Sequence, residues 1–165
     1  MLTVEPFQYL LRVRYSECDA QKVAFNARYG DYIDLAVTEF LRALGYGTAL
    51  VDGGLDYQLV KQTIEWRGPA RFDQILAVGV HPVRVGTTSF ALGSEFRVLG
   101  ESRVFAQAET VYVLVDAESL EKRAVPDDLR AAVERGAPGT VIDHAGAGHG
   151  GGAPVGAASV RQPGS

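Results

Sequence analysis

The sequence has little of several residue types, and each shortage narrows what the protein can be. Cys18 is the only cysteine in 165 residues, so the chain forms no internal disulfide, which fits a reducing compartment. No apolar stretch approaches the roughly 20 residues that cross a membrane. Lys and Arg total 16 against 20 Asp and Glu, a net charge of −4. This balance argues against nucleic acid as the main partner, because such proteins usually carry a basic surface.

The amino terminus also lacks the pattern of a secretory signal, since its first six residues contain no basic segment followed by an apolar run. We therefore expect a cytoplasmic protein with no membrane partner. The composition is that of an ordinary globular protein, with 47% hydrophobic and 22% charged residues. A chain of this length can bury one substantial core.

The hydrophobic pattern predicts a strand, a long helix, four further strands and a short final helix. Apolar residues alternate from Phe7 to Tyr15, with the period of two that is typical of a half-buried strand. From Tyr29 to Leu44 they recur at helical spacing, and Gly45 is the expected stop. Residues 46–54 are rich in glycine and predict a loop.

The four later strands are expected near residues 60–66, 76–82, 90–98 and 104–114, with a helix beginning near Pro126. Consecutive strands joined by short turns form an antiparallel sheet, and one long helix against one sheet gives an α+β domain. From Pro138 onward Gly, Ala, Pro and Ser dominate. We expect residues 138–165 to be a flexible tail, because they have too few large apolar residues to bury.

The segment between the first strand and the long helix carries the residues that suggest chemistry. Asp19 lies shortly before the helix, near unpaired backbone N–H groups and the positive end of the helix dipole. This pairing suits hydrolysis of an acyl compound, since the acid supplies or activates a nucleophile and the N–H groups hold the oxyanion. On pattern alone, however, an aspartate that caps a turn is the commoner case.

Its neighbours have simpler explanations. Asn26 is a candidate helix N-cap, a role compatible with orienting a substrate carbonyl or a water. Glu17 is most simply a solvated acid, and Tyr29 fits the core face of the helix. Cys18 is better explained as a small packing residue than as a nucleophile, because a catalytic thiol needs a neighbouring base.

No metal or cofactor is expected. His144 and His149 fall in the predicted tail, and two histidines alone do not supply the three or four ligands of a zinc site. The sequence contains no P-loop and no dinucleotide-binding fingerprint after a strand.

Several motifs follow one another in a fixed order. They are Tyr15, Asp19, Phe25-Asn26 and Tyr29 around the first loop, then Trp66-Arg67-Gly68-Pro69-Ala70-Arg71-Phe72-Asp73, Ser89-Phe90 and Val125-Pro126-Asp127-Asp128-Leu129-Arg130. This ordered set resembles the hotdog-fold acyl-CoA thioesterases, in particular the 4-hydroxybenzoyl-CoA thioesterase-like branch. The resemblance extends from about residue 7 to residue 135.

The resemblance implies a hotdog domain over residues 1–137, in which an antiparallel five-stranded sheet wraps around one long central helix. It implies a homodimer, often paired into a homotetramer, with active sites at the dimer interface. It also implies an acyl-CoA substrate that is hydrolysed to a carboxylic acid and free CoA without a cofactor. Asp19 then attacks the thioester carbonyl or activates a water, and related enzymes leave these two roles open.

Carried over residue by residue, the resemblance assigns seven site residues. The catalytic pair is Asp19 and Asn26, the substrate contacts are Phe25, Ala27, Arg28 and Tyr29, and Arg84 is a candidate for the CoA phosphates. Two positions depart from the family pattern. Lys22 stands where glycine is common, which predicts a different loop shape or a cation near the site, and Asn26 stands where many members have histidine.

Two other interpretations keep the fold. The protein could hydrolyse a thioester of an acyl-carrier protein, or it could bind acyl-CoA without turnover, an interpretation that Lys22 favours. Neither the acyl group nor the choice between dimer and tetramer follows from the sequence.

Overall fold

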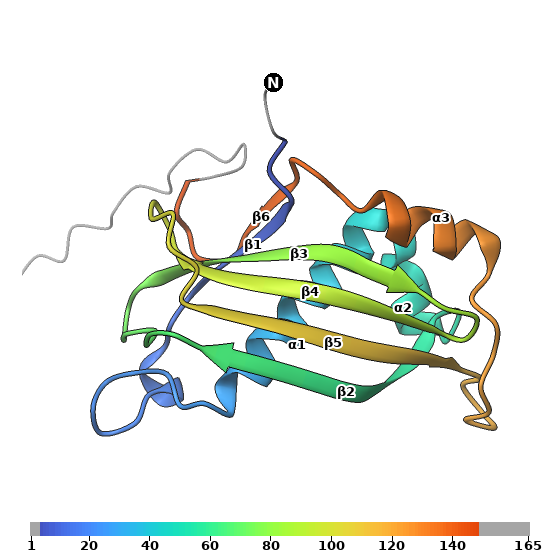
Figure 1. Cartoon of the computed structure of the whole chain (residues 1–165), viewed down its shortest axis with the longest axis horizontal. Coiled ribbons are helices and arrows are strands. Elements are labelled where there is room, and N and C mark those ends of the chain that lie inside the picture. The colour runs from blue at the N-terminus through green and yellow to red at the C-terminus, as the bar shows by residue number, and fades with distance from the viewer. Residues whose placement is uncertain (1–3, 149–165) are drawn as a thin grey trace, which may run out of the picture.

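A sheet wrapped around one long helix dominates the computed structural model, which describes residues 4–148 (Figure 1). The strands lie in the order β2-β5-β4-β3-β1-β6. Their bounds are β1 (Phe7–Arg12), β2 (Asp56–Trp66), β3 (Ile75–Val85), β4 (Ser89–Val98), β5 (Ala106–Val115) and β6 (Val141–Asp143). Neighbouring strands are antiparallel except β6, which runs parallel to β1.

The long helix α1 (Arg28–Leu41) crosses behind the sheet in Figure 1 and closes the core. Its apolar residues recur every three or four positions, so they form one face. The buried members are Tyr29, Tyr32, Ile33, Ala36, Val37, Phe40 and Leu41. Phe40 meets Phe7 of β1 edge to face, with ring centroids 5.5 Å apart. Burying one such side chain contributes about 1.5–3 kcal/mol, so this face fixes the helix against the sheet.

The predicted order of one strand, a long helix, four strands and a short helix is confirmed, with α3 (Asp127–Arg135) as the last helix. The predicted loop over residues 46–54 is wrong. α1 continues into a π-helical turn, η2 (Arg42–Tyr46), and then into α2 (Gly47–Asp52). Gly45 interrupts the regular helix as expected, because its φ of 99° is one that glycine adopts readily.

Strand β6 is the main departure from the predicted five-stranded sheet. Its residues pair in parallel with residues 8–10 of β1. The N–H of Gln8 donates to Thr140 O at 2.9 Å, and that of His144 donates to Leu10 O at 3.0 Å. The first part of the predicted flexible tail therefore belongs to the sheet, which satisfies its backbone without a large buried surface. The rest of that tail, residues 149–165 with His149, lies outside the described residues.

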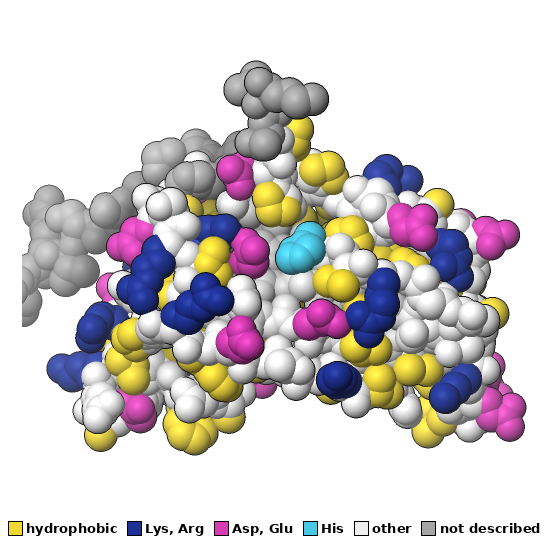
Figure 2. Space-filling view, in the orientation of Figure 1, with side chains coloured by type: hydrophobic (Ala, Val, Ile, Leu, Met, Phe, Trp, Pro, Cys, Tyr) yellow, Lys and Arg dark blue, Asp and Glu magenta, His cyan; other side chains and the backbone are white. Residues whose placement is uncertain are grey.

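The outer face of the sheet, turned away from α1, carries charges of both signs (Figure 2). Arg84 pairs with Glu109 at 2.9 Å, and Arg97 pairs with Glu95 at 2.8 Å. An antiparallel sheet commonly has one such solvated face opposite its packed face. Within residues 4–148, no helix combines the length and the apolar character needed to span a membrane.

Candidate active site

The loop between β1 and α1 folds into a small hairpin beside the start of the helix. Cys18 and Ala24 form an antiparallel β-bridge. Inside it, the N–H of Asp19 donates to Val23 O at 3.0 Å, and the N–H of Lys22 donates to Asp19 O at 2.9 Å. These bonds close a three-residue turn over residues 20–22 and hold Asp19 at its base.

Lys22 occupies the position in this turn that usually needs glycine. Its φ is 61°, in the left-handed region. A three-residue hairpin loop ends in a residue of this conformation, and glycine is the common choice there. Lys22 therefore adopts a backbone conformation that glycine would adopt more readily. A side chain in this conformation costs about 1–2 kcal/mol.

Asp19 is exposed and engaged at only one of its two carboxylate oxygens. Oδ1 accepts the N–H of Gln21 at 2.8 Å, which is the turn-capping role favoured by the sequence pattern alone. Oδ2 has no partner among residues 4–148. The same side chain therefore stabilises the turn and leaves one oxygen available to an incoming molecule.

The turn over residues 25–28 leads from this hairpin into α1 and leaves two donors unused. The N–H of Arg28 donates to Phe25 O at 2.8 Å, while the N–H of Phe25 donates to Glu17 O at 2.9 Å. In the described part of the chain, the N–H groups of Asn26 and Ala27 have no acceptor. Such free N–H groups at a helix start can bind an oxyanion.

The expectation that Asn26 caps the helix is wrong. α1 begins at Arg28, Ala27 holds the N-cap position, and no side chain bonds to the first turn. Ala27 already has helical angles, φ −64° and ψ −21°, so the chain enters the helix through a turn and the cap geometry is not formed. The exposed amide of Asn26 is therefore left for another role.

Four of the five predicted substrate contacts lie between residues 25 and 29, but they differ in exposure. Phe25 is 56% exposed, and Ala27 and Arg28 are also exposed, with Arg28 paired to Asp31 at 3.3 Å. Tyr29 is buried in the core, as its helical spacing favoured. Burial raises the pKa of Tyr29 to about 12, so its hydroxyl stays protonated.

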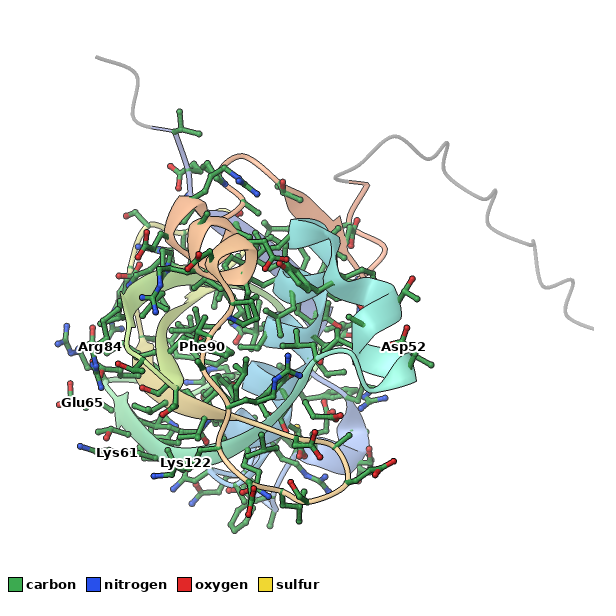
Figure 3. All side chains as sticks on the ribbon, turned by 90° about the vertical axis from the view of Figure 1, so that its right-hand side faces the viewer. Asp52, Lys61, Glu65, Arg84, Phe90 and Lys122 are labelled. Carbon is green, nitrogen blue, oxygen red and sulfur yellow. The ribbon has the colours of Figure 1, made fainter. Side chains whose placement is uncertain are left out.

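Arg84, the predicted phosphate contact, is not brought to this loop within one chain. β1 ends beside the start of β3, where Arg12 pairs with Ile75. Arg84 lies nine positions further along β3, roughly 30 Å away at 3.3–3.4 Å per residue. In Figure 3 it extends from the outer face of the sheet together with Lys61 and Glu65.

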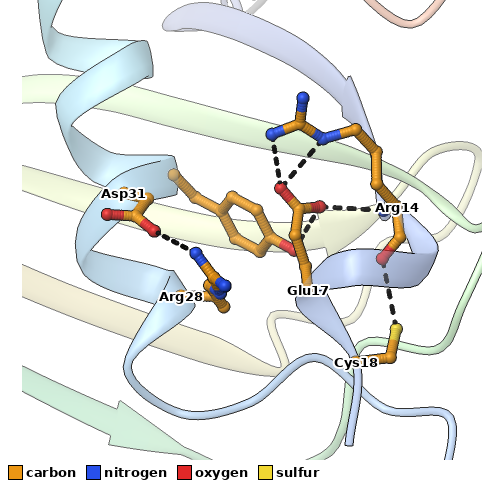
Figure 4. A network of polar contacts seen from close by, with 6 residues as sticks. Arg14, Glu17, Cys18, Arg28 and Asp31 are labelled. Carbon is orange, nitrogen blue, oxygen red and sulfur yellow. Dashed lines mark hydrogen bonds and ion pairs between the residues drawn. The ribbon is translucent and has the colours of Figure 1, made fainter.

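Glu17, which sequence reasoning treated as a solvated acid, is the one buried charged residue in the described part of the chain. Its Oε1 accepts the backbone N–H of Arg14 at 2.8 Å and the hydroxyl of Tyr32 at 3.1 Å (Figure 4). Oε2 accepts Nε and Nη2 of Arg14 at 3.0 and 2.8 Å. The carboxylate thus ties the end of β1 to α1 and fixes the entry to the hairpin.

Burial alone would raise the pKa of Glu17, but the hydrogen bonds from Arg14 and Tyr32 outweigh it and hold the pKa below its ordinary value. Glu17 is therefore charged at neutral pH, and all its acceptor positions are occupied. The only signals for this in the sequence were Arg14 three residues earlier and Tyr32 on the buried face of α1.

The thiol of Cys18 is poorly placed for nucleophilic chemistry. It donates to Arg14 O at 3.4 Å, and burial together with the negative charges of Glu17 and Asp19 raises its pKa. Among residues 4–148, no three His, Cys, Asp or Glu side chains come together as a metal site. His144 was wrongly assigned to a flexible segment, since its Nδ1 lies 3.0 Å from the hydroxyl of Tyr9.

Solved structures share this architecture over nearly their whole length. A hypothetical protein from Aquifex aeolicus has a TM-score of 0.71 and 25% identity, covering 78% of this chain and 99% of its own. The gentisyl-coenzyme A thioesterase BH1999 has a TM-score of 0.67 and 26% identity, covering 76% and 98%. The expected hotdog fold is therefore confirmed, with a sixth strand added.

The sequence comparison defines the family. A model of the thioesterase-like superfamily matches residues 13–133, and the chain belongs to this superfamily. The acyl-CoA thioester hydrolase YbgC of Escherichia coli O6:H1 is 29% identical over 126 residues, which cover 76% of this chain and 93% of that protein. The match to the family ends before β6, which lies outside it.

Proposed function

We propose that the protein hydrolyses acyl-CoA thioesters to a carboxylic acid and free CoA, with Asp19 as the catalytic carboxylate. Membership of the thioesterase-like superfamily supports thioester hydrolysis, and the name of its E. coli relative supports CoA as the carrier. One observation supports the site most directly. A single hairpin presents an exposed carboxylate with a free oxygen and leads straight into two unused N–H groups.

In this mechanism the N–H groups of Asn26 and Ala27 bind the thioester oxygen and stabilise the negative charge that develops there. Asp19 either attacks the carbonyl carbon, giving a mixed anhydride that water hydrolyses, or takes a proton from the attacking water. In both cases the C–S bond breaks and CoA leaves as a thiolate. One donor of this kind contributes about 10²–10³ to the rate.

A homodimer built through β2 completes the proposal. Among the described strands β2 pairs only with β5, so its other edge is free, whereas β6 covers the outer edge of β1. β2 is eleven residues long, and its exposed apolar side chains include Leu59, Val60 and Trp66. A long, apolar free edge pairs readily with a second copy. The ring of Trp66 contacts that of Tyr29 in the first turn of α1, so such an interface lies beside the site.

The test is thiol release from a panel of short-chain, long-chain and aromatic CoA esters. We expect turnover of at least one ester and a loss of kcat of at least about a hundredfold in Asp19→Asn. The matched control is Asp52→Asn, because Oδ1 of Asp52 accepts the N–H of Gly54 at 2.8 Å in the same local geometry. Sedimentation of each variant should give twice the mass of one chain.

Three outcomes would contradict all or part of the proposal. Normal turnover in Asp19→Asn would show that Asp19 is not the catalytic carboxylate. Tight binding of CoA esters without free thiol would make the protein a binding module. Hydrolysis of acyl-carrier-protein esters with no turnover of CoA esters would leave Asp19 as the catalytic carboxylate but make an acyl-carrier protein the acyl donor.

A further inference from the structure

A cavity of about 460 Å³ lies on the β1 side of α1, at the opposite end of the sheet from the free edge of β2. This volume is within the usual range for sites that hold small molecules. The cavity is bounded by β1, by α1 and by the chain that follows β6. Its polar lining residues are Tyr9, Arg12, Arg14, Glu17, Tyr32 and His144.

The carboxylate of this cavity is fully hydrogen-bonded. The side chain of Glu17 is only 6% exposed, and its two oxygens receive four donors from Arg14 and Tyr32. A ligand therefore gains nothing by offering a donor to this carboxylate.

The donors of the cavity, in contrast, are not all used. Within the described chain, Nη1 of Arg14 and Nη2 of Arg12 have no acceptor, and the Arg14 side chain is 71% exposed. The Tyr9 hydroxyl lies 3.0 Å from Nδ1 of His144. Where the hydroxyl donates, the ring proton is on Nε2, which has no hydrogen-bond acceptor within the described chain. Spare donors beside a satisfied acceptor favour an anion, and guanidinium groups suit a carboxylate.

The remaining lining is apolar. Leu11 comes from β1, Ala145 follows β6, and Leu35 of α1 is 44% exposed and so presents apolar surface to the cavity. A ligand that fills this space therefore combines an apolar body with a negatively charged end.

We propose that this cavity is a second ligand site, which binds an organic carboxylate with an aliphatic or aromatic body. The site exists because β6 brings His144 and Ala145 beside β1, and these residues lie beyond the segment that matches the family. Arg12 and Arg14 hold the carboxylate, and Leu11 and Leu35 contact the apolar body. The proposal does not depend on thioester hydrolysis, since the ligand is bound and not converted.

The test is an NMR titration that follows the ring resonance of His144, identified by its loss in His144→Gln. The probes are benzoate and octanoate, with benzamide and octanamide as uncharged controls. We expect a saturable shift with at least one carboxylate and at least tenfold weaker binding of the matching amide. Ala145→Trp fills the cavity and should abolish the shift, while Ala131→Trp on the exposed face of α3 should leave it unchanged.

A second variant covers the case in which Ala145→Trp does not fold. Arg12→Gln removes one donor and an exposed ion pair to Asp73, so the fold should survive and binding should weaken severalfold. Three results would overturn the proposal: no saturable shift up to about 10 mM, equal binding of acid and amide, or an unchanged shift in Arg12→Gln and folded Ala145→Trp. A carboxylate that moves other resonances but not His144 would point to the Asp19 site and leave the proposed function untouched.

Discussion

Glu17 and Asp19 are two acids separated by one residue, and the fold gives them opposite surroundings. Glu17 is buried, and its four hydrogen bonds join β1 to α1. Asp19 is exposed, bonds to its own turn through one oxygen and keeps the other free. The acid whose acceptor positions are all filled is therefore structural, whereas the acid with a spare oxygen beside unused N–H groups is free to take part in chemistry.

The catalytic role proposed for the Asp19 side can be tested at Asn26, where the backbone N–H and the side-chain amide can be removed separately. Asn26→Pro removes both the amide side chain and the N–H, at the first central position of a turn where proline is favoured. Asn26→Ala removes the side chain alone. We expect Asn26→Pro to lower kcat by about 10²–10³ and Asn26→Ala by less than about tenfold. Steady-state kinetics measure this, and equal losses in the two variants would assign the role to the side chain.

The largest effect on stability is expected on the Glu17 side. Glu17→Ala leaves the N–H of Arg14 and the hydroxyl of Tyr32 without their acceptor. Each unsatisfied buried group costs about 1–3 kcal/mol, so the free energy of unfolding should fall by about 2–6 kcal/mol. Chemical denaturation measures it, with Glu134→Ala on the exposed face of α3 as a control that should change stability by less than about 0.5 kcal/mol. A similar small change in both variants would show that the network contributes little.

The pH dependence of stability sharpens the same contrast. Hydrogen bonds hold the pKa of folded Glu17 below the unfolded value of about 4.3, so the unfolded state binds the proton more readily. The stabilisation is complete above that unfolded pKa and is lost as the pH falls through the folded pKa. Wild type should therefore lose stability more steeply than Glu17→Gln below about pH 5. Parallel curves of unfolding free energy against pH would contradict this.

The smallest expected effect concerns the turn that holds Asp19. Lys22→Gly relieves a left-handed side chain but adds backbone freedom to the unfolded state, so we expect a gain of at most about 1 kcal/mol. Lys22→Ala keeps the strain and should leave stability nearly unchanged. Thermal unfolding of both variants measures the difference, and a loss of stability in Lys22→Gly would show that the Lys22 side chain makes a stabilising contact.

The elements that the sequence predicted correctly are those with a local periodic pattern. The strands alternate from residue to residue, and the buried face of α1 recurs with the helical period, so each can be predicted without knowledge of its partners. β6 escaped prediction because three residues in a segment rich in glycine acquire a strand conformation only from the edge of β1. Pairing over such a sequence distance leaves no local signal.

The same distinction applies to the candidate site. Asp19 could be singled out from its place before a helix and from the family pattern. The burial of Glu17 depends on Tyr32, fifteen residues later on another element, and could not be read from its polar neighbours. Arg84 was selected by resemblance to the family, but the bounds of β3 place it far from the loop within one chain.

One paired measurement tests this account most directly: kcat and the free energy of unfolding for Asp19→Asn and Glu17→Gln, both at pH 7 and with the best CoA ester. We expect Asp19→Asn to lose at least about a hundredfold in kcat with a stability change below about 0.5 kcal/mol. Glu17→Gln should lose about 1–3 kcal/mol of stability and keep kcat within about tenfold while it is folded. The reverse pattern, with normal turnover in Asp19→Asn and its loss in folded Glu17→Gln, would contradict the account.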